Sequence, residues 1–239
     1  MPQPCGWGIV SPNAMELSID TASELASVGL SRQGSLVAEI TWRCRRNHTV
    51  ELLPTIEKLL AQAGAAREEI DAVFVCTGPG MYTGLRVGVS TAKGLAYAFG
   101  LPVVGVGRLE LNAYLHAAFP GPIVAVHRAG RGDLAWAAYR DGPWREIVPP
   151  RLARPEELAR RVRQRTLFVG EVDEEMSARL REAAGAKAVV ASPAASMRRA
   201  AALAELAFAR LAAGRADNVA LLRPIYLRPP ATRPHKPGG

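Results

Sequence analysis

The chain has 239 residues, 49% of them hydrophobic, and carries a formal net charge of +8 at pH 7. This length fits one large domain or two of about 100 residues each, and the apolar content is enough to bury a core. No run approaches the roughly 18 consecutive apolar residues that span a bilayer, and the first residues lack the basic and apolar regions of a signal peptide. Cys5, Cys44 and Cys76 are too widely spaced for a disulfide framework or a zinc site. We therefore expect a cytoplasmic protein that does not associate with a membrane.

The charge is unevenly distributed along the chain. The first 107 residues carry 8 basic and 9 acidic side chains, whereas the remainder carries 22 basic and 13 acidic side chains. A basic half is typical of RNA-binding proteins, because phosphate contacts supply affinity that does not depend on sequence. Aromatic residues are not interleaved with these arginines, as a base-stacking surface would require. The pattern favours a solvated basic face, and direct RNA contact stays an alternative.

Hydrophobic periodicity divides the chain into two α/β halves between two terminal segments. Residues 1–14 lack charge and periodicity, so we expect a disordered N-terminal extension, with Met15 as an alternative start. Residues 229–239 are predicted to be a disordered tail. The first domain is predicted over 15–107 and the second over 108–228. Because strands alternate with helices in both, each is expected to form a mixed sheet flanked by helices.

The expected elements follow from apolar alternation, from apolar stripes at helical spacing and from flanking turn residues. A hairpin turn is predicted at 31–34, and Gly64 is expected to end the first helix. The last helix is expected either to stay with the second domain or to pack back on the first. The predicted strands are 17–19, 26–30, 36–42, 72–76, 102–106, 123–127, 134–139, 166–169 and 188–191. The predicted helices are 49–63, 83–99, 156–165, 174–184 and 196–213.

A glycine-rich loop follows the buried strand 72–76, with the sequence Thr77-Gly-Pro-Gly-Met-Tyr-Thr-Gly-Leu-Arg-Val-Gly88. Glycines between a strand and a helix allow a phosphate to approach the helix N-terminus. A P-loop, however, needs Lys and then Ser or Thr after its last glycine, and here Leu85 and Arg86 follow Gly84. The first three glycines are also spaced one residue too long for a dinucleotide fingerprint. The residue types favour a tight turn that feeds a closely packed helix.

That helix has one face with almost no side-chain volume, because Gly84, Gly88, Ala92, Ala96 and Gly100 recur at every fourth residue. Glycine inside a helix costs about 1 kcal/mol relative to alanine, so its presence indicates that another element comes close. Small residues at this spacing are best known from packed membrane helices. The neighbour is either the protein's own sheet or a helix of a partner, and the sequence leaves both open.

Residues that could perform chemistry do not form a known constellation. His48, His116, His127 and His235 are too far apart for a histidine metal pair, and no H-E-x-x-H occurs. The nucleophile pentapeptide G-x-S-x-G is also absent. Cys76 ends a buried strand and is interpreted as a core residue. We therefore predict no catalytic residue, no metal ligand and no cofactor site.

The two α/β halves, the first of which opens on an Asp-Thr turn after its first strand, resemble the actin-like ATPase, or ribonuclease H-like, architecture. In that fold a D-x-G-[ST] turn approaches the nucleotide phosphates. The corresponding turn here is Asp20-Thr-Ala-Ser23, with Ala22 in the place of the glycine. A Cβ atom at that position would crowd a phosphate, which argues against ATPase activity.

Between Met15 and about Pro230 the chain resembles the TsaB (YeaZ) family, the scaffold subunit of bacterial tRNA threonylcarbamoyladenosine synthesis. The glycine-rich segment is the most specific part of the resemblance, and the other segments support it. The segments are Ser18-Ile-Asp-Thr-Ala-Ser23, His48-Thr-Val-Glu-Leu-Leu-Pro54, Gly78-Pro-Gly-Met-Tyr-Thr-Gly-Leu-Arg-Val-Gly88 with Thr91-Ala-Lys-Gly-Leu95, and Pro224-Ile-Tyr-Leu-Arg228.

The resemblance implies a degenerate actin-like fold that performs no chemistry itself. In the family, TsaB pairs with TsaD, which transfers the threonylcarbamoyl group to the adenosine beside the tRNA anticodon. The ATPase TsaE joins that pair, and tRNA is reached indirectly through the complex. An actin-like ATPase or a glycoprotease-like enzyme acting on its own is the alternative.

The TsaB–TsaD contact of the family is a bundle of helices from the two N-terminal domains. Carried over to this chain, the contributing helices are 49–63 and 83–99, which agrees with the small-residue face. Self-association of the free chain through these helices, and a nucleotide held at the partner interface, stay open as alternatives. The predicted partner-binding residues are Thr49, Leu52, Leu53, Ile56, Leu60, Gly84, Leu85, Gly88, Val89, Ala92 and Ala96.

Overall fold

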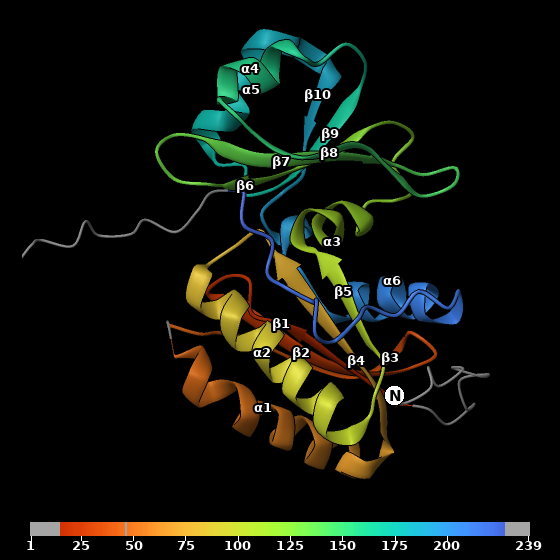
Figure 1. Cartoon of the computed structure of the whole chain (residues 1–239). Helices are drawn as coiled ribbons and strands as arrows, with labels where there is room; N and C mark the ends of the chain where they lie inside the picture. Colours follow the sequence, from red (N-terminus) through yellow and green to blue (C-terminus); the bar gives the residue numbers. More distant parts are fainter. Residues whose placement is uncertain (1–14, 46, 228–239) are drawn as a thin grey trace, which may run out of the picture.

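The computed structural model describes residues 15–45 and 47–227 as two five-stranded mixed sheets with helices on their faces (Figure 1). The sequence predicted this arrangement. The extension 1–14 and the tail 229–239, both predicted to be disordered, lie outside the described residues. None of the helices in the described part of the chain combines the length and the apolar composition that crossing a bilayer requires.

The first sheet has the strand order β3-β2-β1-β4-β5, and its central strand β1 is buried along its whole length. β1 pairs antiparallel with β2 and parallel with β4, so the expected hairpin and the first helical crossover are both present. The hairpin turn uses Gln33 and Gly34, both with positive φ. The strands are β1 Met15–Asp20, β2 Leu25–Arg32, β3 Ser35–Arg43, β4 Ile70–Gly78 and β5 Val103–Gly107.

Helices cover both faces of this sheet, which explains why β1 has no exposed side. α1 (His48–Ala63) and α2 (Tyr82–Phe99) pack on one face through the apolar stripe that the sequence predicted. α6 (Ala200–Ala212) packs on the other face and contacts all five strands, although it follows the second sheet in the chain (Figure 1). Gly64 ends α1 in the left-handed conformation, as predicted.

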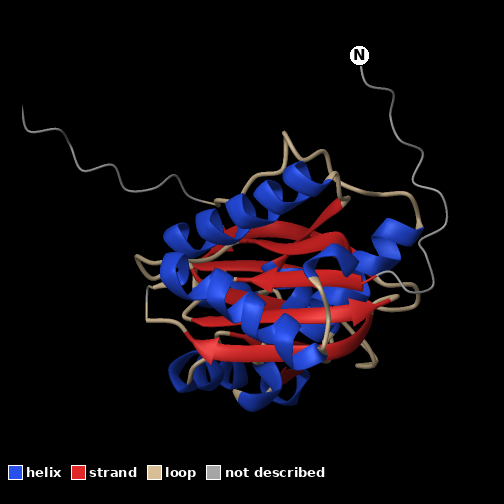
Figure 2. Ribbon diagram, turned by 90° about the horizontal axis from the view of Figure 1, so that it is seen from below, coloured by secondary structure: helices blue, strands red, loops and turns tan. Residues whose placement is uncertain are grey.

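The second sheet has the order β10-β9-β6-β7-β8. α4 (Pro155–Arg160) and α5 (Glu174–Ala184) cover one face, and α3 (Arg108–Tyr114) packs on the other face, between the two sheets (Figure 1). Figure 2 shows from below how helices lie against the strands. The strands are β6 Ile123–Arg128, β7 Leu134–Arg140, β8 Arg145–Ala153, β9 Thr166–Gly170 and β10 Ala188–Val190.

Two elements of the second half were not predicted, and two helices are shorter than expected. β8 contains adjacent prolines and several charges, which hid its strand character; an edge strand tolerates prolines because one side needs no backbone donor. α3 follows β5 directly, and its N-cap residue Gly107 has no side chain that could accept a capping hydrogen bond, which weakens the signal of a helix start. The helix expected over 156–165 ends at Arg160, and the one expected over 196–213 begins at Ala200, after the 3₁₀ turn Ala194–Ser196.

The small-residue face of α2 packs against the chain's own first sheet. A Cβ atom added at Gly84 would overlap the carbonyl oxygen of Thr21, and one added at Gly88 would overlap the hydroxyl oxygen of the same residue. Ala92 and Ala96 on the same face are buried. The close neighbour left open by the sequence is therefore the turn that follows β1, and this face does not form an outer surface.

We predict opposite effects of alanine at two glycines of α2. Gly84→Ala should lower the free energy of unfolding by at least about 1–3 kcal/mol, because the methyl group meets backbone that cannot yield. Gly94→Ala should raise it by about 0.5–1 kcal/mol, because the added Cβ points into open space and alanine is the better helix former. Urea denaturation followed by circular dichroism measures both. Equal stabilities of the two variants would contradict this packing of α2.

Candidate functional site between the sheets and on the outer helices

The Asp20–Ser23 turn, which would approach phosphates in an actin-like ATPase, is closed by the chain itself. The backbone N–H of Met81 donates to the carbonyl of Ala22 at 2.9 Å, and the hydroxyl of Thr21 donates to the carbonyl of Gly84 at 2.7 Å. The N–H of Ala22 donates to its neighbour Asp20 at 2.9 Å, and Ala22 itself is fully buried. The glycine-rich loop therefore packs on this turn, in agreement with the predicted tight turn.

A buried ion pair joins the same turn to the segment before α6. The Nε of Arg198 donates to Asp20 Oδ2 at 2.7 Å, and its Nη2 donates to the hydroxyl of Ser23 at 2.8 Å. Burial alone would raise the pKa of Asp20, but the charge and hydrogen bond of Arg198 outweigh it and hold that pKa below its usual range. Asp20 is therefore an ionised structural partner of Arg198.

A second charged group lies between α3 and the second sheet. Glu171 forms an ion pair with Arg108 of α3, and its other oxygen lies 2.9 Å from Nδ1 of His127 on β6. The backbone N–H of Arg128 also donates to Glu171 at 2.9 Å. Burial raises the pKa of Glu171, but His127 and Arg108 outweigh that effect and lower the pKa overall. This carboxylate stays ionised and ties β6, α3 and the end of β9 together.

A cavity of about 610 Å³ lies between the sheets, and its lining includes Arg108 and Glu171 of the second group and Arg198 of the first. The cationic side chains Arg108 and Arg198 are compensated there by Glu171 and Asp20. Nε of Arg108 and Oδ1 of Asn112 are buried without a hydrogen-bond partner in the described part of the chain. Arg108 and Arg198 are thus held in ion pairs within the chain, which gives these two side chains a structural role. Arg43 also lines the cavity and forms no ion pair within residues 15–45 and 47–227.

Neither a metal site nor a reactive thiol emerges from the described residues. In 15–45 and 47–227, no group of three or more His, Cys, Asp or Glu side chains could hold a metal ion. Burial raises the pKa of the Cys44 thiol to about 11 and that of Cys76 still higher, so both stay protonated at neutral pH. His48 is buried at the start of α1, and its Nε2 lies 3.0 Å from the carbonyl oxygen of Ser23, so it is a structural contact of the Asp20–Ser23 turn.

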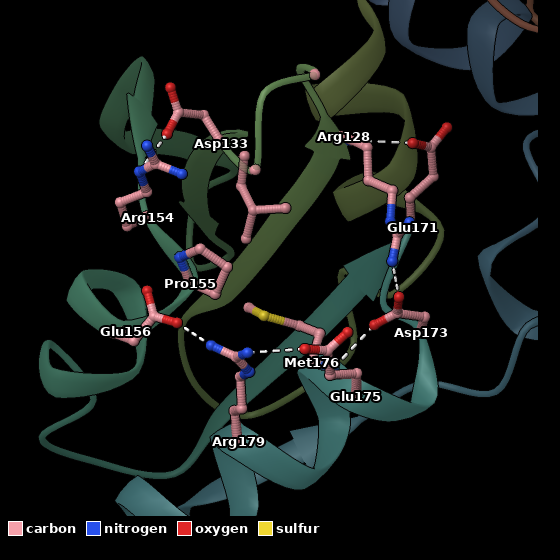
Figure 3. A pocket seen from close by; sticks show the side chains of 13 residues that line it. Arg128, Asp133, Arg154, Pro155, Glu156, Glu171, Asp173, Glu175, Met176 and Arg179 are labelled. Atoms are coloured by element: carbon pink, nitrogen blue, oxygen red, sulfur yellow. Dashed lines mark hydrogen bonds and ion pairs between the residues drawn. The ribbon is translucent and has the colours of Figure 1, made fainter.

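A second cavity, of about 420 Å³, lies on the second sheet beside α4 and α5 (Figure 3). Its arginines face carboxylates: Arg179 pairs with Glu156 and with Glu175, and Arg154 pairs with Asp133 at 3.0 Å. Figure 3 shows the alternation of basic and acidic groups around the rim. The arginines here are engaged with the chain's own carboxylates, so this cavity presents no uncompensated cationic face.

The outer faces of α1 and α2 expose several large apolar side chains among polar ones. Val50 and Leu53 on α1 are 73% and 53% exposed, and Tyr97 on α2 is 86% exposed. Gly94 faces outward from the middle of α2, and a Cβ atom there would meet no atom within 4 Å. Between the apolar side chains this glycine leaves α2 flat, so another helix could approach it closely.

The structure separates the residues predicted to bind a partner into two sets. Thr49 and Leu53 are exposed on the outer face of α1. The others are buried against the first sheet, so the close contact that their spacing indicated is made within the chain, and a partner could not reach them while this packing is kept. The buried residues are Leu52, Ile56, Leu60, Gly84, Leu85, Gly88, Val89, Ala92 and Ala96. The sequence did not single out Val50, Gly94 and Tyr97, which the structure places among the exposed residues of α1 and α2.

Comparison with known proteins first defines the class. ROK hexokinase from Thermus thermophilus superposes with a TM-score of 0.50 over 84% of this chain and 99% of its own, at 12% identity, which shows a shared fold. YeaZ from Pseudomonas aeruginosa superposes with a TM-score of 0.75 over 90% of this chain and 100% of its own, at 26% identity. The fold is therefore the predicted two-sheet architecture of the actin-like ATPases.

The sequence comparisons then identify the family. The family described as tRNA N6-adenosine threonylcarbamoyltransferase (TsaD) matches residues 36–234. "tRNA threonylcarbamoyladenosine biosynthesis protein TsaB" of Bacillus subtilis is 33% identical over 56% of this chain and 59% of its own length. TsaB of Escherichia coli is 33% identical over 62% of this chain and 66% of its own length. TsaB of Haemophilus influenzae is 31% identical over 65% of this chain and 71% of its own length. The chain belongs to the TsaB (YeaZ) family, and the matched part spans 59% and 66% of the length of the first two relatives.

Removing one member of the buried ion pair should be far more destabilising than removing both. Arg198→Met leaves the Asp20 carboxylate buried and unpaired, which should cost about 3–5 kcal/mol of unfolding free energy. The double variant Asp20→Asn, Arg198→Met should recover most of that loss. Arg179→Met, which removes an exposed arginine, is the control and should cost about 1 kcal/mol or less. A single variant as stable as the double variant would rule out the buried pair.

His127 should make the protein less stable below neutral pH. Burial, with a smaller effect of Arg108, holds the pKa of His127 below 6.5 against the opposing effect of Glu171. As the pH falls, His127 therefore binds its proton at a higher pH in the unfolded chain than in the folded one. The contribution of neutral His127 to folding stability is complete above pH 6.5 and is lost as the pH falls below that value. One proton gives a slope of at most about 1.4 kcal/mol per pH unit. Urea titrations from about pH 8 to 5 should show the unfolding free energy falling with pH, and His127→Gln should reduce this dependence. The same pH dependence in His127→Gln would show that another group causes it.

Proposed function

We propose that this chain is a non-catalytic subunit in tRNA threonylcarbamoyladenosine biosynthesis, and that it pairs with a TsaD protein through the outer faces of α1 and α2. The curated relatives carry the name of this biosynthesis, and the matching family is that of the threonylcarbamoyltransferase itself. The observation that carries the proposal is the exposed apolar surface around Leu53, Gly94 and Tyr97.

The non-catalytic part of the proposal is supported by the region between the sheets. The turn at Ala22 is covered by the glycine-rich loop, and Asp20 is committed to Arg198. A nucleotide phosphate at this turn would have to displace both contacts. In our interpretation the chain keeps the architecture of an ATPase and uses the corresponding cleft to join its two sheets.

The docking part is supported by the size and composition of the outer helix face. A standard interface buries about 800 Å² of each partner, which two adjacent helices of this length can supply. Clustered exposed apolar side chains that are bordered by polar residues are typical of interaction sites in soluble proteins. Gly94 would let a partner helix lie close to α2, while Val50, Leu53 and Tyr97 would fill the spaces beside it.

In this proposal the remaining partners join through the pair. TsaD would carry the transferase chemistry, TsaE would bind the TsaD–TsaB pair, and tRNA would reach this chain as part of the complex, in the cytoplasm. Self-association of the free chain would use the same face of α1 and α2. A homodimer would therefore dissociate as TsaD is added, because the two assemblies compete for Leu53 and Tyr97.

Charges introduced on the outer helix face should prevent pairing without unfolding the chain. Leu53→Glu and Tyr97→Glu replace exposed apolar groups and should each weaken TsaD binding at least about tenfold, as central interface residues do. Ile147→Glu is the control, because Ile147 is 41% exposed on β8 of the other sheet. Calorimetric titration gives the affinities, and light scattering gives the mass of the complex.

Two results would contradict the proposal. Unchanged TsaD binding by both folded variants would place the interface elsewhere. Appreciable ATP hydrolysis by the isolated chain, abolished by a substitution at Asp20, would show that the turn is a working nucleotide site and would favour the ATPase alternative.

A further inference from the structure

A groove lies between α2 and the segment 218–227, which are far apart in the sequence. The segment 218–227 crosses the first sheet next to α2: the N–H of Ile225 donates to the carbonyl of Thr77 at 2.7 Å. Lys93 of α2 donates to the carbonyls of Ala220 and Leu222 at 3.1 and 3.2 Å, which fixes the same segment further along. The groove between them encloses about 460 Å³.

This tyrosine groove is defined by Tyr82, Arg86 and Lys93 on one side and Arg223 and Tyr226 on the other. Its lining contains three cationic side chains and no carboxylate. Within 15–45 and 47–227, none of the three forms an ion pair. The cavity of Figure 3 differs, because its arginines lie against carboxylates of the chain. The tyrosine groove therefore presents positive charge to an external anion.

Aromatic rings line the same groove. The ring centroids of Tyr82 and Tyr226 lie 5.2 Å apart with their planes tilted by 34°, and the two residues are 42% and 38% exposed. The guanidinium of Arg86 lies 5.3 Å from the centre of the Tyr82 ring and donates to its hydroxyl at 2.9 Å. The rings are held in place and yet leave part of their surface free, so they can stack with a planar ligand.

Exposed aromatic rings among unpaired cations are what single-stranded nucleic acid requires: the rings stack with bases and the cations contact the phosphates. We propose that the tyrosine groove binds a single-stranded RNA segment, with an unstacked base against Tyr226 and phosphates near Arg86 and Arg223. The identification of this RNA as a tRNA loop rests on the proposed function, whereas the binding of single-stranded RNA does not.

The position of the groove fits the assembly proposed above. α2 supplies Tyr82, Arg86 and Lys93 to the groove and Gly94 and Tyr97 to the outer helix face. RNA in the groove would therefore lie beside a partner docked on α1 and α2. The basic second half that the sequence suggested for RNA contributes Arg223 and Tyr226 to the groove, whereas its arginines on the second sheet, such as Arg154 and Arg179, face carboxylates.

The test measures binding of a fluorescein-labelled single-stranded RNA of about ten nucleotides to the full chain by anisotropy. Arg223→Gln should weaken binding at least about threefold and lower the slope of log K against log salt by about 0.7. Tyr226→Ala should weaken binding about five- to tenfold with the slope unchanged, whereas Tyr226→Phe, which keeps the ring, should bind as the unmodified chain does. Arg181→Gln on α5, an exposed arginine that lines neither the groove nor the cavity of Figure 3, is the matched control and should change neither quantity.

Three results would overturn the groove assignment. They are equal losses for Arg223→Gln and Arg181→Gln, unchanged binding by folded Tyr226→Ala, and equally tight binding of duplex RNA of the same length. TsaD pairing is measured on the same variants. RNA binding without TsaD pairing would refute the proposed function and keep the groove, and pairing without RNA binding would refute the groove alone.

Discussion

The close approach of α2 to the turn after β1 is the contact on which the rest of the structure depends. Gly84 and Gly88 let the helix backbone reach Thr21, and the hydroxyl of Thr21 in turn donates to the carbonyl of Gly84. This contact covers the turn that an actin-like ATPase would use for phosphates. It also fixes the rotation of α2, because a helix that turns its small face inward must turn the opposite face, with Gly94 and Tyr97, to the outside.

The two sheets are joined through α3, which packs apolar side chains toward both of them, and through buried charges beside it. Asp20 from the first sheet pairs with Arg198, and Glu171 from the second pairs with Arg108 of the intervening helix. Buried pairs contribute little net stability, since desolvation cancels much of the attraction, but an unpaired member is costly. They therefore act mainly to permit one relative placement of the sheets. The catalytic cleft of an ATPase would need these positions free for ligand, and here the chain has used them for its own architecture.

Much of the fold could be predicted from the sequence, because local periodicity determines α1, α2 and the strands of the first sheet. The prolines of β8 hid an edge strand, since their tolerance there depends on where the strand lies in the sheet. At the site, the spacing of Gly84 and Gly88 identified a close contact correctly but could not say with what. Helical period shows which residues share a face; only the tertiary structure shows which face meets the sheet. For the same reason no local pattern could predict that Tyr82 and Tyr226 lie side by side in the folded chain.

The glycines of α2 separate the needs of the fold from those of recognition. Each costs the helix about 1 kcal/mol relative to alanine, so each needs a compensating contact. Gly84 and Gly88 have one, because any side chain there would overlap Thr21. Gly94 has none within the described structure: open space surrounds it, and no packing of the chain requires its small size. A residue that weakens its own helix without benefit to the fold is most simply explained by a contact outside it, which is the reason to place the partner on this face of α2.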